Sequence, residues 1–368
     1  MKIGIDVREL GGRPTGVGRY LAQLLDAWAA GSAARRHDIV CYAPDAPSPA
    51  AAATMAALGA TVRVVPGGAG TVWEQFRLPS AAGADHLDVF FAPAYTAPLA
   101  ISCPTVVTIH DLSYVAHPEW FRPRERWRRT IVTRLTARRA TGILTDSEFS
   151  RCEVIRLLGI APERVTVVPL GLGLPIAPGG PGACPREPLV LYVGSIFNRR
   201  RVPDLIAAFA TVARVHPNAA LELVGEDRTW PRQDLGAAIA ATGCADRIRL
   251  RSWIADDALA DLYARASAFA FLSEYEGFGL TPLEALANGI PAVVLDTPVA
   301  REVCGDAAFF VQPGDIPGTA ATIERAMFDP DARARSLTAA HALLGRYSWP
   351  VAAAATLGAL ERAGGARP

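Results

Sequence analysis

Lysine is almost absent from this chain of 368 residues. Lys2 is the only one, so 36 of the 37 basic residues are arginines. A P-loop needs a lysine beside the nucleotide phosphates, and a pyridoxal-phosphate enzyme needs an interior lysine for its Schiff base. Lys2 stands at neither kind of position, so the sequence excludes both chemistries.

An excess of charge of one sign is also missing, because 37 basic residues face 36 acidic ones and the formal net charge is +1. A protein that binds nucleic acid is expected to be clearly basic, so we expect no nucleic-acid partner. The six cysteines are too far apart for a C-x-x-C pair, which argues against a zinc site and a redox dithiol. Scattered thiols of this kind are typical of a cytoplasmic protein.

The sequence has no segment that predicts export or a membrane span. The first ten residues, MKIGIDVREL, carry an acid and a base within their apolar stretch, unlike a signal peptide. The uncharged run 89–109 is long enough to span a bilayer, but Pro93, Pro98 and Pro104 would break a helix there. We therefore expect a soluble, cytoplasmic protein.

Short apolar runs alternate with amphipathic stretches along the whole chain, which predicts parallel sheets with helices on both faces. The expected strands are 3–7, 38–42, 61–65, 89–91, 105–109 and 142–145, then 189–193, 221–224, 247–250, 268–272 and 292–295. The clearest helical patterns are 19–30, 124–140, 203–215, 258–266 and 349–363.

The alternation stops at a stretch rich in proline and glycine and then restarts, which predicts two domains. We expect an N-terminal Rossmann-like domain over 1–170 and a linker over 171–188. A second βα domain should follow over 189–345, and a helix in 346–368 should pack back on the first domain. Ligands bind at the carboxyl ends of strands in such sheets, so two of them facing each other would enclose a cleft.

The most informative segment is EYEGFGLTPLEALANGIP at 274–291. Thr281, Pro282 and Glu284 fit a capping box, in which Glu284 would only cap its own helix. Alternatively, the amides of Gly279 and Leu280 form a phosphate cradle at the helix N-terminus, with Glu276 and Glu284 as acceptors for sugar hydroxyls.

Glu276, seven residues and then Glu284 resemble the E-x7-E signature of retaining family-4 glycosyltransferases, which adopt the GT-B fold. The surrounding GFGL and P-x-E-A-x-A-x-G letters strengthen the resemblance. It implies that Glu276 contacts the donor sugar and that Glu284 binds the nucleotide ribose. It also places the donor site beside a run of four residues, Phe278, Gly279, Leu280 and Thr281.

Residues 191–209, LYVGSIFNRRRVPDLIAAF, fit the same family. The Gly194-Ser195 turn and the pair Arg199 and Arg200 stand where members carry an Arg-Lys pair on the donor diphosphate. Arg200 replaces the lysine, and arginine can still grip phosphate in a bidentate way. Which of Arg199, Arg200 and Arg201 contacts the diphosphate stays open, and a solvated basic loop is the alternative.

Three weaker segments follow the family order. Gly16 and Gly18 precede the first expected helix, as in the family's glycine-rich loop near the donor, although a tight turn would also explain them. His110-Asp111 follows a strand where members place a pair facing the sugar and the acceptor, so His110 is a catalytic candidate and Asp111 an acceptor-side one. A structural histidine is the alternative.

The turn with Trp253 and Ile254 corresponds to the turn that contacts the nucleotide base in members of the family.

Eight arginines crowd the stretch 122–139, together with the aromatic residues of 120–127 and only one acid, Glu125. Such a stretch could dock on anionic lipid headgroups at the inner face of the membrane or hold an anionic acceptor. Equally, it could be a solvated helix face whose arginine stems cover apolar surface.

The resemblance implies a retaining transferase that moves a hexose, mannosyl or glucosyl in type, from a nucleotide-diphosphate sugar to an acceptor hydroxyl. It also implies that the domain 1–170 is the acceptor-side domain and that the domain 189–345 binds the nucleotide sugar. No D-x-D pair stands in a suitable loop, so we expect no metal and no cofactor. The acceptor could be a glycan, a lipid-linked or a small molecule, and bacterial surface-polysaccharide or glycoconjugate synthesis is the expected setting. A sugar-nucleotide epimerase or hydrolase of the same fold, or a noncatalytic binding module, remains an alternative.

Overall fold

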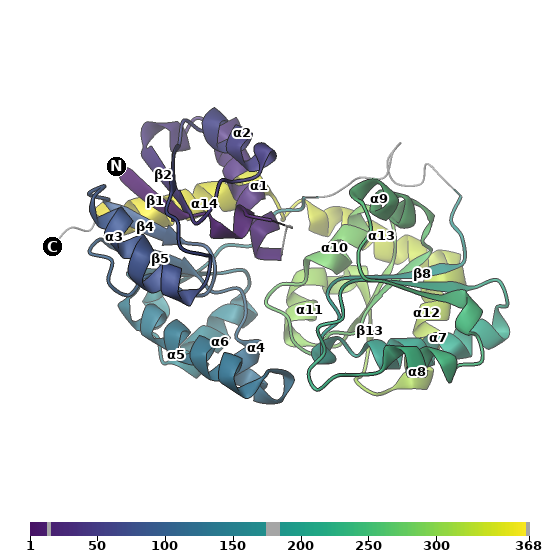
Figure 1. The fold of residues 1–368 in the computed structure, drawn as a ribbon. Coiled ribbons are helices and arrows are strands. Elements are labelled where there is room, and N and C mark those ends of the chain that lie inside the picture. Colours follow the sequence, from purple (N-terminus) through teal and green to yellow (C-terminus); the bar gives the residue numbers. More distant parts are fainter. Residues whose placement is uncertain (13–15, 174–184, 366–368) are drawn as a thin grey trace. The chain divides into compact units, whose positions relative to one another are not determined.

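The computed structural model describes residues 1–12, 16–173 and 185–365, and it divides into two compact units (Figure 1). The N-terminal unit comprises Met1–Ala116, Arg124–Gly171 and Tyr347–Pro368, and the C-terminal unit comprises His117–Pro123 and Leu172–Arg346. Most of the predicted linker, residues 174–184, lies outside the described residues.

The N-terminal unit is built on a seven-stranded parallel sheet with the order β3-β2-β1-β4-β5-β6-β7. Its central strands β1 and β4 are almost completely buried, as expected when helices cover both faces of a sheet. The strands are β1 (Lys2–Asp6), β2 (Asp38–Ala43), β3 (Thr61–Val64), β4 (Val89–Ala92), β5 (Thr105–Thr108), β6 (Gly142–Thr145) and β7 (Val165–Val167).

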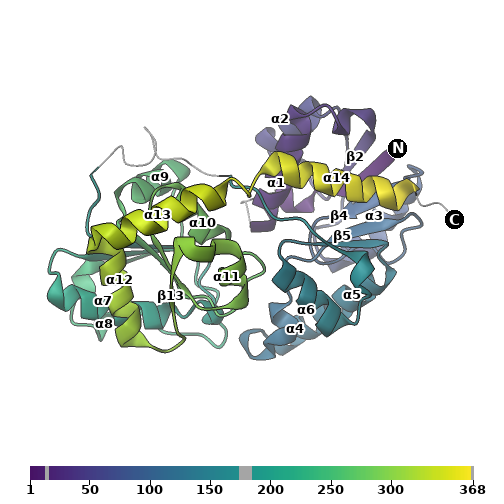
Figure 2. The same ribbon diagram turned by 180° about the vertical axis from the view of Figure 1, so that it is seen from behind.

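Helices connect these strands, and the last helix of the chain completes the unit. Trp28 of α1 donates from its indole nitrogen to the carbonyl of Ala353 in α14 over 2.9 Å, and Leu360 of α14 is fully buried. Figure 2 shows α14 lying beside α1. The helices and helical turns are η1 (Arg8–Leu10), α1 (Gly16–Ala30), η2 (Ala34–Arg36), α2 (Pro49–Ala57), the π-helical η3 (Trp73–Arg77), α3 (Leu78–Gly83), α4 (Ser113–Ala116), α5 (Pro123–Arg139), α6 (Glu148–Leu158), η5 (Pro162–Arg164) and α14 (Trp349–Gly365). The helical turn η4 (Pro118–Trp120), between α4 and α5 in the sequence, belongs to the C-terminal unit.

The C-terminal unit repeats this plan with a six-stranded parallel sheet in the order β10-β9-β8-β11-β12-β13. In both sheets the chain first adds strands to one side of the first strand and then to the other. The strands are β8 (Leu189–Val193), β9 (Ala220–Val224), β10 (Ile248–Arg251), β11 (Ala268–Phe271), β12 (Ala292–Leu295) and β13 (Ala308–Val311).

Apolar spacing explains how the helices of this unit pack on the sheet. In α7, Leu205, Phe209 and Val212 recur at helical intervals and are buried. Helix α7 packs with α8 and α12, whereas α9 and α10 cover the other face (Figure 1). The helices are η6 (Asn198–Arg200), α7 (Val202–Val215), α8 (Leu235–Ala240), η7 (Ala245–Arg247), α9 (Asp256–Arg265), α10 (Leu280–Ala287), α11 (Pro298–Cys304), η8 (Gly305–Ala307), α12 (Ile316–Phe328) and α13 (Pro330–Leu344).

The predicted fold class of two parallel α/β domains is confirmed, although β7 and β13 were not predicted. The uncharged run 89–109 forms β4 and β5 rather than a helix, as its prolines indicated. In the described residues, no helix is both long and apolar enough to cross a membrane.

Candidate functional site

The candidate site of the C-terminal unit lies at the point where the strand order of its sheet reverses. Strands β8 and β11 are neighbours there, and each leads at its carboxyl end into a loop with charged residues. The loop after β8 carries Arg199 and Arg200, and the loop after β11 carries Glu276. Such reversal points are where open α/β sheets bind ligands.

A tight turn after β8 brings the arginines to this edge. Gly194 has φ of 143°, and a Cβ atom at this position would lie 2.6 Å from Nη1 of Arg200. The carbonyl of Ser195 accepts hydrogen bonds from Nη1 of Arg200 at 2.8 Å and from the hydroxyl of Tyr192 at 3.1 Å. The turn therefore requires glycine, and it fixes the direction of the Arg200 side chain.

Glu276 joins the two loops through one of its carboxylate oxygens. Its Oε1 accepts from Nε of Arg200 at 2.8 Å and from the hydroxyl of Ser273 at 2.8 Å. Nε of Arg199 lies 3.8 Å from the same oxygen, within ion-pair range but beyond hydrogen-bond distance. In the described part of the chain no donor is bonded to Oε2, so this oxygen can accept a hydrogen bond from a ligand.

Electrostatics keeps this cluster ionised. Burial of the Glu276 carboxyl opposes its ionisation, but the charges of Arg200 and Arg199 outweigh burial and hold its pKa below the ordinary value. Burial likewise disfavours the charged form of Arg200, but the attraction of the Glu276 carboxylate is stronger and raises the pKa of Arg200 above its ordinary value. Two guanidinium groups against one carboxylate leave a net positive charge, which suits a phosphate group.

The neighbouring arginines differ in what they contact. Arg199 is 7% exposed and stacks over the ring of Phe197 at 4.4 Å, and its Nε has no hydrogen-bond partner among the described residues. Arg201 has φ of 44° and pairs with Asp204 at 2.5 Å and with Glu274. The structure thus brings Arg199 and Arg200 to Glu276 and turns Arg201 to other carboxylates.

Helix α10 begins differently from the capping box that its sequence predicts. Gly279 is the N-cap residue with φ of 95°, the helix begins at Leu280, and no side chain caps it. Thr281 lies inside the first turn, and its buried hydroxyl has no partner among the described residues. The capping-box interpretation is therefore wrong. An N-cap in the left-handed region favours glycine, and the first amides of a helix have no acceptor within it.

The carboxylate of Glu284 does not turn back to the helix start. It is 9% exposed and accepts a hydrogen bond from the hydroxyl of Tyr263 in α9 at 3.3 Å. Helix α9 follows the turn with Trp253, which is 66% exposed, and the less exposed Ile254. Tyr263 thus connects Glu284 to the helix that follows the predicted base-binding turn.

A small hollow lies directly beside Glu276. Ser273, Phe278, Gly279 and Pro282 line it together with apolar residues from β11, β12 and α11. In the described residues no group of three or more His, Cys, Asp or Glu side chains is arranged to hold a metal ion.

In the N-terminal unit, His110 follows β5 and is buried. Nδ1 of its ring lies 2.7 Å from Oδ2 of Asp146, and Nε2 lies 3.0 Å from the carbonyl of Pro93. A carbonyl only accepts, so Nε2 carries a hydrogen, and the contact with Asp146 holds a second proton between the two side chains. Burial opposes the charged ring, but Asp146 and the Pro93 carbonyl outweigh it and raise the His110 pKa.

The other N-terminal candidates have local structural partners. Asp111 accepts from the backbone amide and the hydroxyl of Ser113 at 2.9 and 2.6 Å, and from Tyr95 at 3.3 Å. The prediction that Gly16 and Gly18 precede the first helix is wrong. Both lie in the first turn of α1, where Gly16 is exposed and Gly18 is buried. Residues 13–15 of the predicted glycine-rich loop lie outside the described residues.

Three residues of these sites were not predicted: Ser273 and Tyr263, which bond the two glutamates, and Asp146, which bonds His110. Ser273 and Asp146 both follow the carboxyl end of a strand, as His110 does. Applying the strand-end rule to every strand would have found these two. Tyr263 lies within a helix, and the sequence around it carries no such signal.

Two protein families match this sequence. Residues 14–174 match the family described as Glycosyltransferase Family 4, and residues 181–341 match Glycosyl transferases group 1. The chain is 28% identical over 268 residues to the O-antigen chain mannosyltransferase B of Escherichia coli, a match that covers 70% of this chain and 70% of that protein.

Solved structures resemble the whole chain. Sucrose-phosphate synthase from Thermosynechococcus elongatus matches with a TM-score of 0.75 and 20% identity over 98% of both chains. Anabaena Alr3699/HepE in complex with UDP and glucose matches with a TM-score of 0.74 and 20% identity, over 98% of this chain and 100% of that one. At this identity the likeness defines the fold alone.

The two doubly wound sheets and these structural relatives define the class as the GT-B fold of glycosyltransferases. The chain itself is a glycosyltransferase that belongs to the group 1 and family 4 glycosyltransferases, with the family 4 part first and the group 1 part second.

Proposed function

We propose that this glycosyltransferase is a retaining, metal-independent hexosyltransferase whose C-terminal unit binds a nucleotide-diphosphate sugar. The observation that carries the proposal is the convergence of Arg199, Arg200 and Glu276 at one sheet edge, beside the start of α10. Two cations and the first amides of a helix suit the diphosphate, and Oε2 of Glu276 suits a sugar hydroxyl.

The roles of the two glutamates follow from their surroundings. Glu276 accepts a hydrogen bond from Arg200 and forms an ion pair with Arg199, the two arginines that would hold the diphosphate, so its second oxygen would orient the transferred sugar. Glu284 lies further along α10 and is bonded to Tyr263, so it would accept hydrogen bonds from the ribose. The backbone around Trp253 and Ile254 would meet the base.

Catalysis would rest on electrostatic stabilisation of the leaving group. As the bond from the sugar C1 to the phosphate oxygen breaks, charge grows on the β-phosphate, and Arg199 and Arg200 are already in place to meet it. The acceptor oxygen would bond to C1 on the same face, and its proton would pass to the departing phosphate oxygen. Glu276 is a poor nucleophile for a covalent route because two arginines stabilise its charge.

The donor, acceptor and setting are proposed from relatives. One relative is a mannosyltransferase of O-antigen chains, and one structural relative was solved with UDP and glucose, so we propose a mannosyl or glucosyl donor. A glycan or lipid-linked glycan would be the acceptor, with His110 and Asp111 of the N-terminal unit on the acceptor side. Synthesis of a bacterial surface polysaccharide at the inner face of the membrane, touched through residues 122–139, is the proposed setting.

A thermal-shift screen with UDP-, GDP-, ADP- and dTDP-sugars tests donor binding, because a ligand raises the melting temperature only if it binds the folded state. The donor that raises the melting temperature is then incubated with the protein in three ways: without acceptor, with a glycan acceptor, and with the acceptor plus EDTA. We expect a glycoside that keeps the anomeric configuration of the donor, formed with and without EDTA. A new sugar nucleotide formed without acceptor would instead identify an epimerase, and an inverted product would contradict retention.

A further inference from the structure

Helix α5 presents a mixed basic and apolar face to solvent. It carries seven arginines and one acid, Glu125, over its 17 residues. Its inner side is formed by Thr133, Thr136 and Ala137, which are buried. The residues opposite them fall within one third of the helix circumference at 100° per residue: Arg124, Trp127, Arg128, Ile131, Arg134, Leu135 and Arg138.

The arginines of this face lack acidic neighbours. In the described residues none of Arg124, Arg128, Arg134 and Arg138 lies within ion-pair distance of a carboxylate, and the one ion pair of α5 joins Arg129 to Glu125. Elsewhere exposed arginines such as Arg249 and Arg228 have acidic partners. Exposed Arg214 and Arg335 form no ion pair in the described residues either, but α5 gathers four such arginines on one face. The cations of this face therefore remain available to an anionic partner.

The apolar residues between them are unusually exposed. Trp127 is 67% exposed and Leu135 is 42% exposed, and Ile131 lies between them on the same face. Arginine stems that cover apolar surface would hide these side chains instead of leaving them open to water. A solvated helix face gains nothing from a tryptophan and a leucine in these positions.

A second element adds apolar surface beside α5. Val72 directly precedes η3 and is 68% exposed, and Phe76 lies within η3 and is 73% exposed. Both line a shallow hollow with Leu99 and Ala100. The opposite side of η3 is anchored, because Trp73 and Glu74 are buried. The exposed side chains thus stand on a fixed element.

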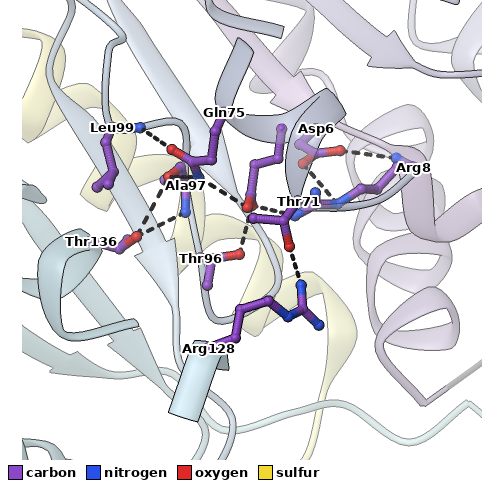
Figure 3. A network of polar contacts seen from close by, with 10 residues as sticks. Asp6, Arg8, Thr71, Gln75, Thr96, Ala97, Leu99, Arg128 and Thr136 are labelled. Carbon is purple, nitrogen blue, oxygen red and sulfur yellow. Dashed lines mark hydrogen bonds and ion pairs between the residues drawn. The ribbon is translucent and has the colours of Figure 1, made fainter. Parts of the chain in front are cut away.

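Figure 3 shows the polar network that holds η3 in place. Glu74 accepts from Arg8 and from the hydroxyl of Thr96, and Gln75 accepts from the amide of Leu99 at 3.0 Å. Arg128 of α5 donates to the hydroxyl of Thr71, which directly precedes Val72. This last contact joins the exposed side of η3 to the outer face of α5.

We propose that these two parts form one docking face for the surface of an anionic lipid bilayer. We define the docking face as Val72, Phe76, Arg124, Trp127, Arg128, Ile131, Arg134, Leu135 and Arg138. Arginines without acidic partners complement anionic headgroups, and the aromatic and aliphatic side chains insert at the level of the headgroups. A second copy of the chain is a poor partner, because two such faces would bring like charges together.

This inference specifies the membrane contact of the proposed function, but it is tested without sugar or transfer. Cosedimentation of the full chain with phosphatidylcholine vesicles, with and without about one third phosphatidylglycerol, measures lipid affinity. We expect binding to the anionic vesicles only, weakened by salt. Arg134→Glu/Arg138→Glu should weaken it more than about tenfold, whereas Arg214→Glu/Arg335→Glu, an exposed pair on the C-terminal unit, should leave it unchanged.

The apolar contribution has its own matched pair. Phe76→Ser should weaken vesicle binding several-fold, while Val351→Ser, at a similarly exposed position on α14, should not. Circular dichroism and melting temperature confirm that each variant is folded. Equal binding to neutral and anionic vesicles, equal loss in both charge-reversal pairs, or concentration-dependent dimers that involve this face would overturn the proposal. Failure of the NDP-sugar screen would contradict the proposed transfer reaction and leave this result intact.

Discussion

Arg200 donates from Nε to Oε1 of Glu276 over 2.8 Å and so connects the loop after β8 to the loop after β11. The same guanidinium group donates to the carbonyl of Ser195 at 2.8 Å. One side chain therefore positions both the turn that is proposed to face the donor phosphate and the carboxylate that is proposed to face the donor sugar.

Arg200→Lys should weaken donor binding, because an ammonium group cannot hold Ser195, Glu276 and a phosphate in one planar geometry. We expect a loss of about 1–2 kcal/mol in the free energy of donor binding, measured by calorimetry. Arg201→Lys is the matched control, since Arg201 pairs with Asp204 and Glu274. Equal losses in both variants would contradict the assignment of Arg200 to the diphosphate.

Glu276→Ala and Glu284→Ala should fail in different ways. Glu276→Ala should lower kcat by about 100-fold or more with a smaller effect on donor affinity, because it removes a group that orients the reacting sugar. Glu284→Ala should mainly weaken donor binding, by about 1.5–3 kcal/mol for a lost charged hydrogen bond. Steady-state kinetics with donor calorimetry separates the two, and unchanged donor affinity in Glu284→Ala would count against its ribose role.

Gly194→Ala should destabilise the C-terminal unit through both its backbone and its contacts. The new Cβ would lie 2.6 Å from Nη1 of Arg200, at a φ of 143°. We expect a loss of about 2–4 kcal/mol in the free energy of unfolding. Gly159→Ala, at a φ of 68° with nothing within 4 Å of its Cβ, carries only the backbone strain of about 1–2 kcal/mol. Urea denaturation compares the pair, and equal losses would argue against the steric contact.

His110 and Asp146 should make stability depend on pH. The pKa of His110 is raised above 6.5 in the folded protein, so its contribution is complete below that value and is lost as pH rises through the folded pKa. Asp146→Asn removes this contribution, so the difference in melting temperature between wild type and variant should shrink as pH rises from about 6 to about 9. A constant difference across that range would show that the pair holds no additional proton.

The fold class was predictable because it depends on repeated, long-range patterns of apolar residues. Strand β7 (Val165–Val167) escaped prediction because three residues are too few for a recognisable period. Strand β13 (Ala308–Val311) was missed although β3 and β10, edge strands of the same length, were predicted. The start of α10 was misjudged because Thr281 and Pro282 fit two helix starts, and the left-handed conformation of Gly279 selected the earlier one.

The convergence of Arg199, Arg200 and Glu276 agrees with the sequence prediction, but their individual contacts could not be predicted. Sequence order indicated the arginines and both glutamates, yet the turn of η6, with Arg201 in the left-handed region, decides which arginines reach Glu276. Contacts such as Tyr263 with Glu284 join residues of separate helices, and their pairing depends on how those helices pack.

The central claim is that Arg199 and Arg200 form the diphosphate subsite of a donor site in the C-terminal unit. Titration calorimetry of wild type and Arg199→Ala/Arg200→Ala with UDP, GDP, ADP and dTDP, each beside its monophosphate, tests this most directly. We predict that one diphosphate binds the wild type more tightly than its monophosphate, and that the double variant loses this preference while it stays folded. An undiminished preference for the diphosphate in the double variant would contradict the claim.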